Sequence, residues 1–271
     1  MPGTLFVVAT PIGNLDDITL RALRVLRDVT IIAAEDTRRT AHLLARHAIA
    51  TPTTSLHEHN ETKKTGAIVA RLLAGDSVAL VSDAGTPTVS DPGVGLIRAA
   101  LDAGVRVEPI PGPNAAIAAL SVSGLPTESF TFLGFPPTRP KARQLWLHEL
   151  ASVPGTAVFY ESPHRIKATL GDLTNIIGDR TIVIGRELTK INEELVRGPI
   201  STVISRLSSE RGEFTVVIEI GHRPENELAN ATRSVDSRRE TIASLAKHLG
   251  VSANELYRVV EQLRNRSNNR I

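Results

Sequence analysis

Short apolar runs alternate with amphipathic segments of helical period through the first half of the chain. Such runs are typical of buried strands, and the segments between them are typical of helices. Strands separated by helices need crossover connections, so this alternation predicts an α/β fold with a mainly parallel sheet. The predicted strands are 4–9, 29–34, 78–81 and 105–110, and the predicted helices are 17–27, 38–46, 62–73, 94–103 and 115–121.

The second half has a different order of elements. The last two apolar runs lie close together in the sequence, which favours antiparallel pairing and a second α/β domain with a mixed sheet. The predicted strands are 130–135, 156–160, 181–185, 195–197 and 214–220, and the predicted helices are 141–151, 164–176 and 201–208. The predicted domains are 1–125 and 126–221, followed by a polar linker at 222–236 and a helical extension at 237–271.

Composition excludes several classes of protein. The 271 residues contain no cysteine, so disulfides, Cys-ligated zinc, iron–sulfur clusters and cysteine nucleophiles are all ruled out. No apolar run approaches membrane-spanning length, and the residues after Met1 lack the basic and apolar regions of a signal peptide. We therefore expect a soluble, cytoplasmic protein that does not interact with membranes.

The C-terminal extension carries the positive charge of the chain. Residues 222–271 hold nine Lys/Arg and six Asp/Glu, whereas the remainder holds 22 basic and 23 acidic residues. Ser237 with Glu240 and Ser252 with Glu255 match the capping-box pattern, so two short amphipathic helices are expected there. Such a helix-turn-helix-like unit can bind nucleic acid, and it can equally dock onto its own protein or onto a dimer mate.

The segment 78–93 is the strongest candidate for a ligand site. An apolar strand runs directly into a loop that holds Gly85, Gly93, Pro87 and Pro92. Glycine permits positive φ and proline restricts φ, so the loop backbone is held in a defined conformation. Open α/β sheets bind ligands at the carboxyl ends of their strands, so this loop is expected to hold a small polar molecule by its backbone.

Further polar clusters follow other predicted strands. The first strand ends in a Gly/Pro turn at 9–14 that is neither a GxGxxG nor a Walker A motif, which disfavours nicotinamide, flavin and P-loop chemistry. The segment 57–61 contains an HxH pair, which alone is weak evidence for a metal site. The clusters at 35–39, 160–165 and 186–190 combine carboxylates with cations, as surface ion pairs or anion-binding sites do.

Eight motifs in order give the chain a specific resemblance. They are TPIGN, EDTR, SLHEHNE, VSDAGTPTVSDPG, PIPGPNA, FYESPHR, RELTK and GEFTVVIE, between residues 10 and 219. With them the chain resembles the bacterial 16S rRNA (cytidine) 2′-O-ribose methyltransferases of the tetrapyrrole-methylase-like superfamily. The resemblance covers nearly the whole chain, more loosely in the C-terminal extension.

The resemblance implies a two-domain enzyme, usually a homodimer, that binds S-adenosylmethionine in the cleft between its domains. Its substrate is then 16S rRNA in the small ribosomal subunit. Thr86 stands where tetrapyrrole enzymes commonly have Asp, so a contact between a carboxylate and the cofactor ribose is not expected here. The residues that match cofactor-binding positions are Pro11, Ala84, Gly85, Thr86, Val89, Asn114, Ala115, Glu161 and Leu188.

Methyl transfer to a ribose hydroxyl needs a group that accepts the hydroxyl proton. The candidate acceptors are the carboxylates of Glu35, Asp36, Glu161 and Glu187, and Lys190 or an arginine would lower the pKa of the hydroxyl. No metal is required. The basic residues expected to face RNA are Arg38, Arg39, Arg165 and Arg186, together with Lys190.

Two other functions stay open. One is methylation of a tetrapyrrole or of a modified protein side chain by the same fold. The other is a ligand-sensing helix-turn-helix regulator. A regulator would need the ligand loops but not a group of reactive side chains around the ligand.

Overall fold

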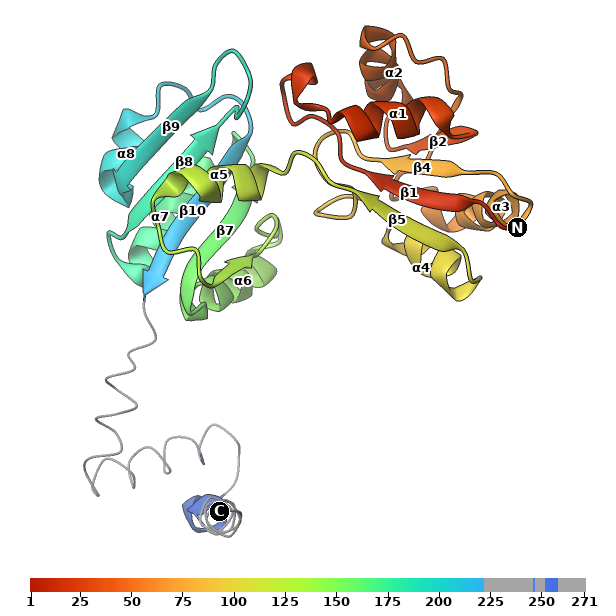
Figure 1. Cartoon of the computed structure of the whole chain (residues 1–271). Helices are drawn as coiled ribbons and strands as arrows, with labels where there is room; N and C mark the ends of the chain where they lie inside the picture. The colour runs from red at the N-terminus through yellow and green to blue at the C-terminus, as the bar shows by residue number, and fades with distance from the viewer. Residues whose placement is uncertain (222–245, 247–251, 258–271) are drawn as a thin grey trace, which may run out of the picture. The chain divides into compact units, whose positions relative to one another are not determined.

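The computed structural model describes residues 1–221, 246 and 252–257. The chain divides into two compact units, Met1–Gly221 and His222–Ile271. The first unit contains both sheets (Figure 1). In the part of the chain that is described, no helix is long and apolar enough to cross a membrane.

The first sheet is entirely parallel. Its strand order is β3-β2-β4-β1-β5, so β1 lies between β4 and β5. Every carboxyl end therefore lies at the same edge of the sheet. The strands are β1 (Thr4–Val8), β2 (Ile31–Ala34), β3 (Thr53–Ser55), β4 (Val78–Val81) and β5 (Arg106–Ile110).

Helices cover both faces of this sheet. Successive residues of β4 point to opposite faces, so Ala79 and Val81 join one core and Val78 and Leu80 join the other. The first core contains residues of α1 and α2, and the second contains residues of α3 and α4. The helical segments are η1 (Leu15–Asp17), α1 (Leu20–Asp28), α2 (Thr37–Arg46), α3 (Glu61–Leu73) and α4 (Val94–Asp102).

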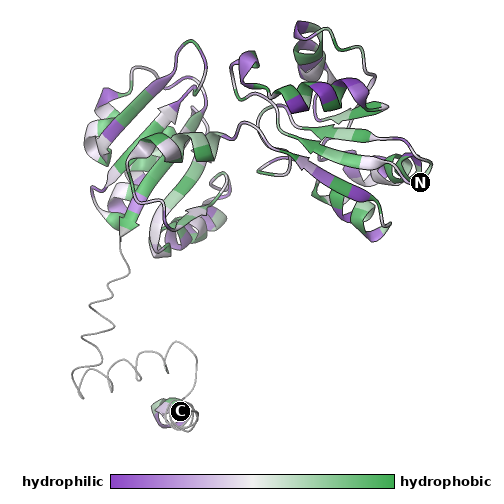
Figure 2. Cartoon of the chain, viewed as in Figure 1, coloured by the Kyte–Doolittle hydropathy of each residue, from purple (hydrophilic) through white to green (hydrophobic). Residues whose placement is uncertain are grey.

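The second sheet is mixed, as predicted. Its order is β6-β7-β10-β8-β9, in which β6 and β7 are parallel and the other neighbours are antiparallel. The strands are β6 (Phe130–Phe132), β7 (Gly155–Glu161), β8 (Thr181–Arg186), β9 (Glu194–Pro199) and β10 (Phe214–Gly221). Figure 2 shows that hydrophobic residues are concentrated in the strands of both sheets.

The two faces of the second sheet are covered differently. Three helices contribute to the larger core on one face: α6 (Pro140–Ser152), α7 (Ile166–Ile177) and α8 (Ile200–Arg206). The other face packs against α5 (Ala115–Ser123) through Ala116, Ala119 and Leu120. Helix α5 follows β5 of the first sheet, so it directly connects the sheet carrying the predicted ligand loops to the second sheet.

Most predicted elements are present, with ends that differ by a few residues. The fold class is confirmed, and strand 78–81 is found with the predicted bounds. Strand β3 was expected only as a strand end before residue 57, without bounds of its own, because it has only three partly buried residues, all of them Thr or Ser. The predicted domain limits at 125 and 126 stay predictions.

The capping box at Ser252 is confirmed. Its hydroxyl oxygen accepts a hydrogen bond from Glu255 N (3.3 Å), and the Glu255 carboxylate accepts one from Ser252 N (3.2 Å). A helical stretch follows at 253–257. The predicted linker at 222–236 and the capping box at Ser237 lie outside the described residues.

Candidate active site

The loops that follow β1 and β4 are joined by backbone hydrogen bonds. Thr10 N donates to Gly85 O (2.8 Å), and Gly85 N donates to Thr10 O (3.0 Å). Gly85 has a φ of +81°, which a residue without a Cβ adopts at little cost. Two of the predicted ligand loops are therefore held against each other at the carboxyl edge of the first sheet.

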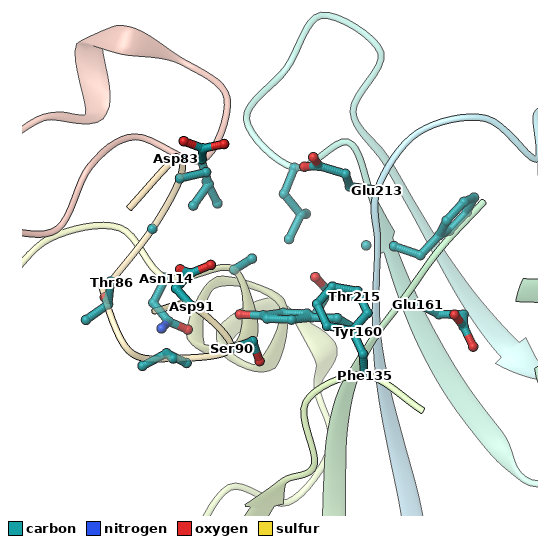
Figure 3. Close-up of a pocket in the computed structure, with 18 of the residues that line it drawn as sticks. Asp83, Thr86, Ser90, Asp91, Asn114, Phe135, Tyr160, Glu161, Glu213 and Thr215 are labelled. Carbon is teal, nitrogen blue, oxygen red and sulfur yellow. The ribbon is translucent and has the colours of Figure 1, made fainter. Parts of the chain in front are cut away.

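The same edge forms a cavity of about 400 Å³. A volume of this size suits a ligand as large as a nucleoside derivative. Residues from the second sheet and from α5 complete its wall (Figure 3). The residues that line it are Ile12, Glu35, Arg39, Asp83, Ala84, Gly85, Thr86, Val89, Ser90, Asp91, Asn114, Ala115, Phe135, Tyr160, Glu161, Ser162, Pro163, Gly185, Leu188, Glu213, Phe214 and Thr215.

The loop after β4 has an unusual backbone conformation. Thr88 and Ser90 have φ values of +72° and +67°, in the left-handed region that is unfavourable for residues with a Cβ. Gly93 has a φ of +122°, and a Cβ there would lie 2.7 Å from a Leu80 methyl group. Strained residues of this kind persist only where surrounding structure holds them, and here they direct Ser90 and Asp91 into the cavity.

The loop after β8 reaches the loop after β1. Thr189 Oγ1 accepts a hydrogen bond from Asn14 N (3.0 Å), and Lys190 packs so closely against Gly13 that a Cβ there would overlap its side chain. Glu187 and Thr189 both have positive φ, at +50° and +67°. This conformation places Leu188 in the cavity wall.

The predicted cofactor residues gather around this cavity, with one exception. Asn114 caps α5 by accepting a hydrogen bond from Ile117 N (3.2 Å), and Thr86 Oγ1 donates to Pro113 O (3.2 Å). Pro11 instead lines an adjacent cavity of about 60 Å³. The predicted residues that line the larger cavity are Ala84, Gly85, Thr86, Val89, Asn114, Ala115, Glu161 and Leu188.

Of the predicted proton acceptors, Glu35 lines the cavity and Asp36 does not. Burial raises the pKa of Glu35, against a hydrogen bond from Asp83 N (3.3 Å) that favours the charged form. Asp36 caps α2 and pairs with Arg38 at 2.7 Å, which holds the pKa of Asp36 far below its usual range. Asp36 is thus a poor base, because a carboxylate so stabilised has little affinity for a proton.

Glu161 is placed differently from what its strand-end position suggests. Its side chain is fully buried, accepts hydrogen bonds from Ser162 N (2.6 Å) and Thr169 Oγ1 (2.5 Å), and pairs with Arg165 (2.9 Å). Figure 3 shows the carboxylate pointing away from the cavity. The geometry gives this carboxylate a structural role on the α7 side of the sheet.

Glu187 and Lys190 form an ion pair next to the cavity. Glu187 Oε1 accepts from Lys190 Nζ (2.9 Å) and from Glu213 N (2.9 Å). Burial raises the pKa of Glu187, but these two hydrogen bonds outweigh it and the pKa lies below its usual value. Burial likewise opposes the charge of Lys190, whereas Glu187 and Glu213 raise its pKa above the usual value.

Some residues that line the cavity were not among the predicted site residues. Asp91 belongs to the loop after β4, where burial and the neighbouring Glu35 raise its pKa to about 6. Tyr160 Oη accepts a hydrogen bond from Ala116 N (3.2 Å), and its ring packs against Phe132 and Phe135 with centroids 4.9 and 5.3 Å away. Tyr160 lies in the motif FYESPHR and Asp91 in VSDAGTPTVSDPG, but nothing in the sequence distinguished them from their neighbours.

The predicted RNA-facing cations fall into two groups. Arg38 and Arg39 have side chains that are 89% and 67% exposed. Arg165 instead donates to Pro136 O (3.0 Å) and pairs with Glu161. Arg186 is buried and donates to Arg211 O (2.8 Å), to Asn192 O (3.1 Å) and to Glu194 (3.2 Å), so its guanidinium faces its own domain.

Solved structures with this architecture define the class of fold. The chain is similar to uroporphyrin-III C-methyltransferase from Thermus thermophilus complexed with S-adenosylhomocysteine, with a TM-score of 0.57, 18% identity and coverage of 80% of this chain and 98% of that one. It is also similar to a diphthine synthase, with a TM-score of 0.60, 15% identity and coverage of 80% and 90%. At these identities the likeness shows the fold alone.

A family model and curated relatives identify the family. The model of the tetrapyrrole (corrin/porphyrin) methylases matches residues 4–204, so the chain belongs to this methyltransferase family. The chain is 52% identical over 223 residues to ribosomal RNA small subunit methyltransferase I of Xylella fastidiosa, covering 80% of this chain and 82% of the relative. It is 44% identical over 279 residues to the protein of that name from Pseudomonas aeruginosa, covering 98% and 99%. The predicted resemblance is confirmed.

Proposed function

We propose that the chain is an S-adenosylmethionine-dependent methyltransferase that modifies the ribose 2′-hydroxyl of a cytidine in small-subunit (16S) rRNA. The observation that carries this proposal is the 44% identity to a ribosomal RNA small subunit methyltransferase I across 98% of the chain. Relatives of that name favour RNA over the tetrapyrrole substrates of the more distant neighbours. A ligand-sensing regulator is disfavoured, because reactive side chains surround the cavity.

The cavity fits S-adenosylmethionine in size and in charge. Small residues, among them Ala84, Gly85 and Ala115, leave room for a ligand close to the backbone. The carboxylates of Glu35 and Asp91 give the wall negative charge, and the aromatic faces of Phe135 and Tyr160 add further electron density. A sulfonium cation is attracted to both kinds of group.

When bound, S-adenosylmethionine supplies an electrophilic methyl group on a sulfonium. The protein has to align the ribose hydroxyl with that methyl group and to accept the hydroxyl proton. Three of the four predicted acceptors are held by hydrogen bonds and cations: Asp36, Glu161 and Glu187. The proton acceptor is therefore Glu35 or another carboxylate of the cavity near it. Lys190 stays a candidate for polarising the hydroxyl, at the cost of its ion pair with Glu187.

Arg38 and Arg39 are the cations best placed to contact RNA phosphates. Both lie in the first turn of α2, next to the carboxyl edge of the first sheet, and both are largely exposed. Arg165 is a weaker candidate because its side chain is only 27% exposed, and we leave Arg186 out of the RNA-binding surface because it is buried. A further proposal is that the basic extension at 237–271 strengthens binding to the ribosomal particle.

We also propose that the enzyme is a homodimer. Supporting this, Ile117 and Val122 on α5 are 51% and 55% exposed, on the same helix whose other face packs against the second sheet. A second copy of the chain would bury this apolar face. Ile117→Asp should give a monomer in sedimentation, whereas Leu20→Asp, at an exposed leucine of α1, should not. A cytoplasmic location and independence of metal ions stay predictions.

The direct test is methyl transfer. The purified full-length protein is incubated with methyl-labelled S-adenosylmethionine and unmodified small ribosomal subunits. Label at a cytidine 2′-oxygen, located by nuclease digestion and mass spectrometry, is the expected result. Label on a base or on ribosomal protein, or no label at all, would overturn the proposal.

A further inference from the structure

We propose that Asp91, which lines the cavity beside Asn114, is the catalytic carboxylate that accepts the proton of the ribose hydroxyl. The inference rests on the proposed function, because it assumes a hydroxyl substrate. It gives a specific role to a residue that was not among the predicted acceptors.

The position of Asp91 follows from the loop that carries it. Ala84, Gly85 and Thr86, which are proposed to bind the cofactor, begin the same loop. The positive φ of Thr88 and Ser90 turns the chain back, so that Asp91 lines the cavity as well. Figure 3 shows Asp91 beside Asn114, with the Tyr160 ring extending toward both. Asp91 is thus presented to the same space as the proposed cofactor contacts.

The other carboxylates of the cavity are engaged. Asp83 accepts a hydrogen bond from Asp36 N (2.9 Å) and pairs with Arg39 (3.4 Å). Glu213 pairs with Lys190 (3.0 Å), and Glu35 accepts from Asp83 N (3.3 Å). Within the described part of the chain, no Lys, Arg or His lies within ion-pairing distance of Asp91.

The electrostatic surroundings of Asp91 favour proton uptake. Burial is the largest cause, followed by the negative charge of Glu35, and Asp83 adds to it, whereas the Ser82 hydroxyl acts in the opposite direction. Tyr160 faces Asp91 from the second sheet; burial raises the pKa of Tyr160, and the charge of Asp91 adds to this. The resulting pKa of about 6 leaves Asp91 ionised at neutral pH yet basic enough to take a proton.

Glu35 differs from Asp91 in what surrounds it. Burial raises the pKa of Glu35, as it does that of Asp91, but the Asp83 N–H, Arg39 and His57 each favour the charged form of Glu35. These groups only partly offset the burial of Glu35, and its remaining negative charge acts on Asp91. The pair therefore resembles two carboxylates that share a site, in which the charge of one raises the proton affinity of the other.

The proposed step is balanced in atoms and charge. The ribose oxygen forms a bond to the methyl carbon while the carbon–sulfur bond breaks, and the sulfur keeps that electron pair. The O–H proton passes to the Asp91 carboxylate, and the neutral acid then releases the proton to water. The products are the methyl ether, the neutral thioether and one proton.

The test compares Asp91→Asn with the full-length wild-type enzyme. The wild-type kcat/KM should rise with pH through about pH 6 and then level off, because only ionised Asp91 accepts a proton. Asp91→Asn should lower the plateau at least about 100-fold and remove the inflection, since general base catalysis contributes about that much. Asp91→Glu should keep part of the activity. Asp102→Asn, at an exposed carboxylate of α4, is the matched control and should behave as wild type.

Glu35→Gln separates the two carboxylates. Removing the negative charge beside Asp91 should move the inflection to lower pH while most of the plateau rate is kept. If Glu35 were the acceptor instead, Glu35→Gln would lose the rate and the inflection, and Asp91→Asn would only shift it. That exchange of effects would overturn the proposal.

Calorimetry with S-adenosylhomocysteine provides a measurement that does not depend on activity. Asp91→Asn should bind it within about threefold of wild type, because a proton acceptor does not hold the cofactor. A loss of affinity that matches the loss of rate would make Asp91 a cofactor ligand and overturn the proposal. If the wild-type enzyme labels no RNA, the proposed function fails first, and the role of Asp91 fails with it. If wild type labels RNA and Asp91→Asn keeps its rate and pH profile, only the role of Asp91 fails.

Discussion

Two cavity carboxylates of the first sheet, Glu35 and Asp91, have surroundings opposite to those of three carboxylates of the second sheet. At the first sheet, Glu35 and Asp91 line the cavity with raised pKa values and without an ion pair among the described residues. At the second sheet, Glu161 pairs with Arg165, Glu187 with Lys190 and Glu194 with Arg186.

This difference distinguishes carboxylates that can take part in catalysis from carboxylates that stabilise the fold. A carboxylate surrounded by donors and cations is held in its charged form, which fixes the local structure but removes its use as a base. Carboxylates that are left without cations destabilise the folded state slightly and are available for proton transfer. Each of the following predictions tests whether the two groups behave as differently as their surroundings indicate.

The largest effect is expected from filling the cavity at the first sheet. Ala84→Phe places a ring among the proposed cofactor contacts, and S-adenosylhomocysteine binding should weaken more than about 100-fold in calorimetry, because a displaced ligand loses most of its buried contacts. Ala74→Phe, at an exposed position after α3, is the control. Gly85→Val is less informative because valine at a φ of +81° would also strain the backbone. Unchanged affinity in Ala84→Phe would place the cofactor elsewhere.

Removing the buried carboxylate of the second sheet should affect stability rather than binding. Glu161→Gln leaves Arg165 and Arg143 without their shared charge partner, and should lower the free energy of unfolding by about 3 kcal/mol. Denaturant titration measures this loss, with the exposed Glu149→Gln as control. Below its melting temperature the variant should bind S-adenosylhomocysteine normally. If the variant keeps its stability but loses affinity for S-adenosylhomocysteine, Glu161 is a cofactor-binding residue after all.

The sequence predicted which loops lie together, because parallel strands share an edge. Loops after strands 4–9 and 78–81 had to lie near each other, and the Thr10–Gly85 hydrogen bonds show that they do. The resemblance to a known family, not the composition of those loops, named the small residues that line the cavity, such as Ala84 and Ala115. The bounds of β3 were not predicted, because three Thr and Ser residues show no apolar run.

The directions of individual side chains could not be predicted. Tyr160 and Glu161 are adjacent in β7, so they point to opposite faces of the sheet. Tyr160 packs with α5 at the cavity, whereas Glu161 bonds Thr169 on α7. Asp91 was overlooked for a related reason: its direction depends on positive φ at Thr88 and Ser90, residue types that give no sequence signal for that conformation.

The surroundings of Asp91 also predict a dependence of stability on pH. Its pKa is raised in the folded protein, so between about pH 4 and pH 6 the folded state binds more protons than the unfolded state and stability falls as pH rises. Asp91→Asn lacks this penalty. At pH 8 it should be more stable than wild type by about 1 kcal/mol, allowing for screening by solvent, and below about pH 4 the difference should vanish. Thermal unfolding at both pH values measures this, and an equal gain at both would point to packing instead of charge.

The smallest effect concerns the exposed arginines of the first sheet. Arg38 and Arg106 each pair with a nearby carboxylate at 2.7 Å and are 89% and 73% exposed, but Arg38 follows a strand at the carboxyl edge and Arg106 begins β5 at the opposite edge. If Arg38 contacts one phosphate, Arg38→Ala should reduce the slope of log K against log salt by about one unit, because one fewer counterion is released on binding. Arg106→Ala should leave the slope unchanged. Filter binding of small-subunit rRNA between low and moderate salt measures both slopes. Equal slopes in the two variants would show that Arg38 serves only to hold Asp36 at the start of α2, and the RNA-binding surface would then have to lie elsewhere.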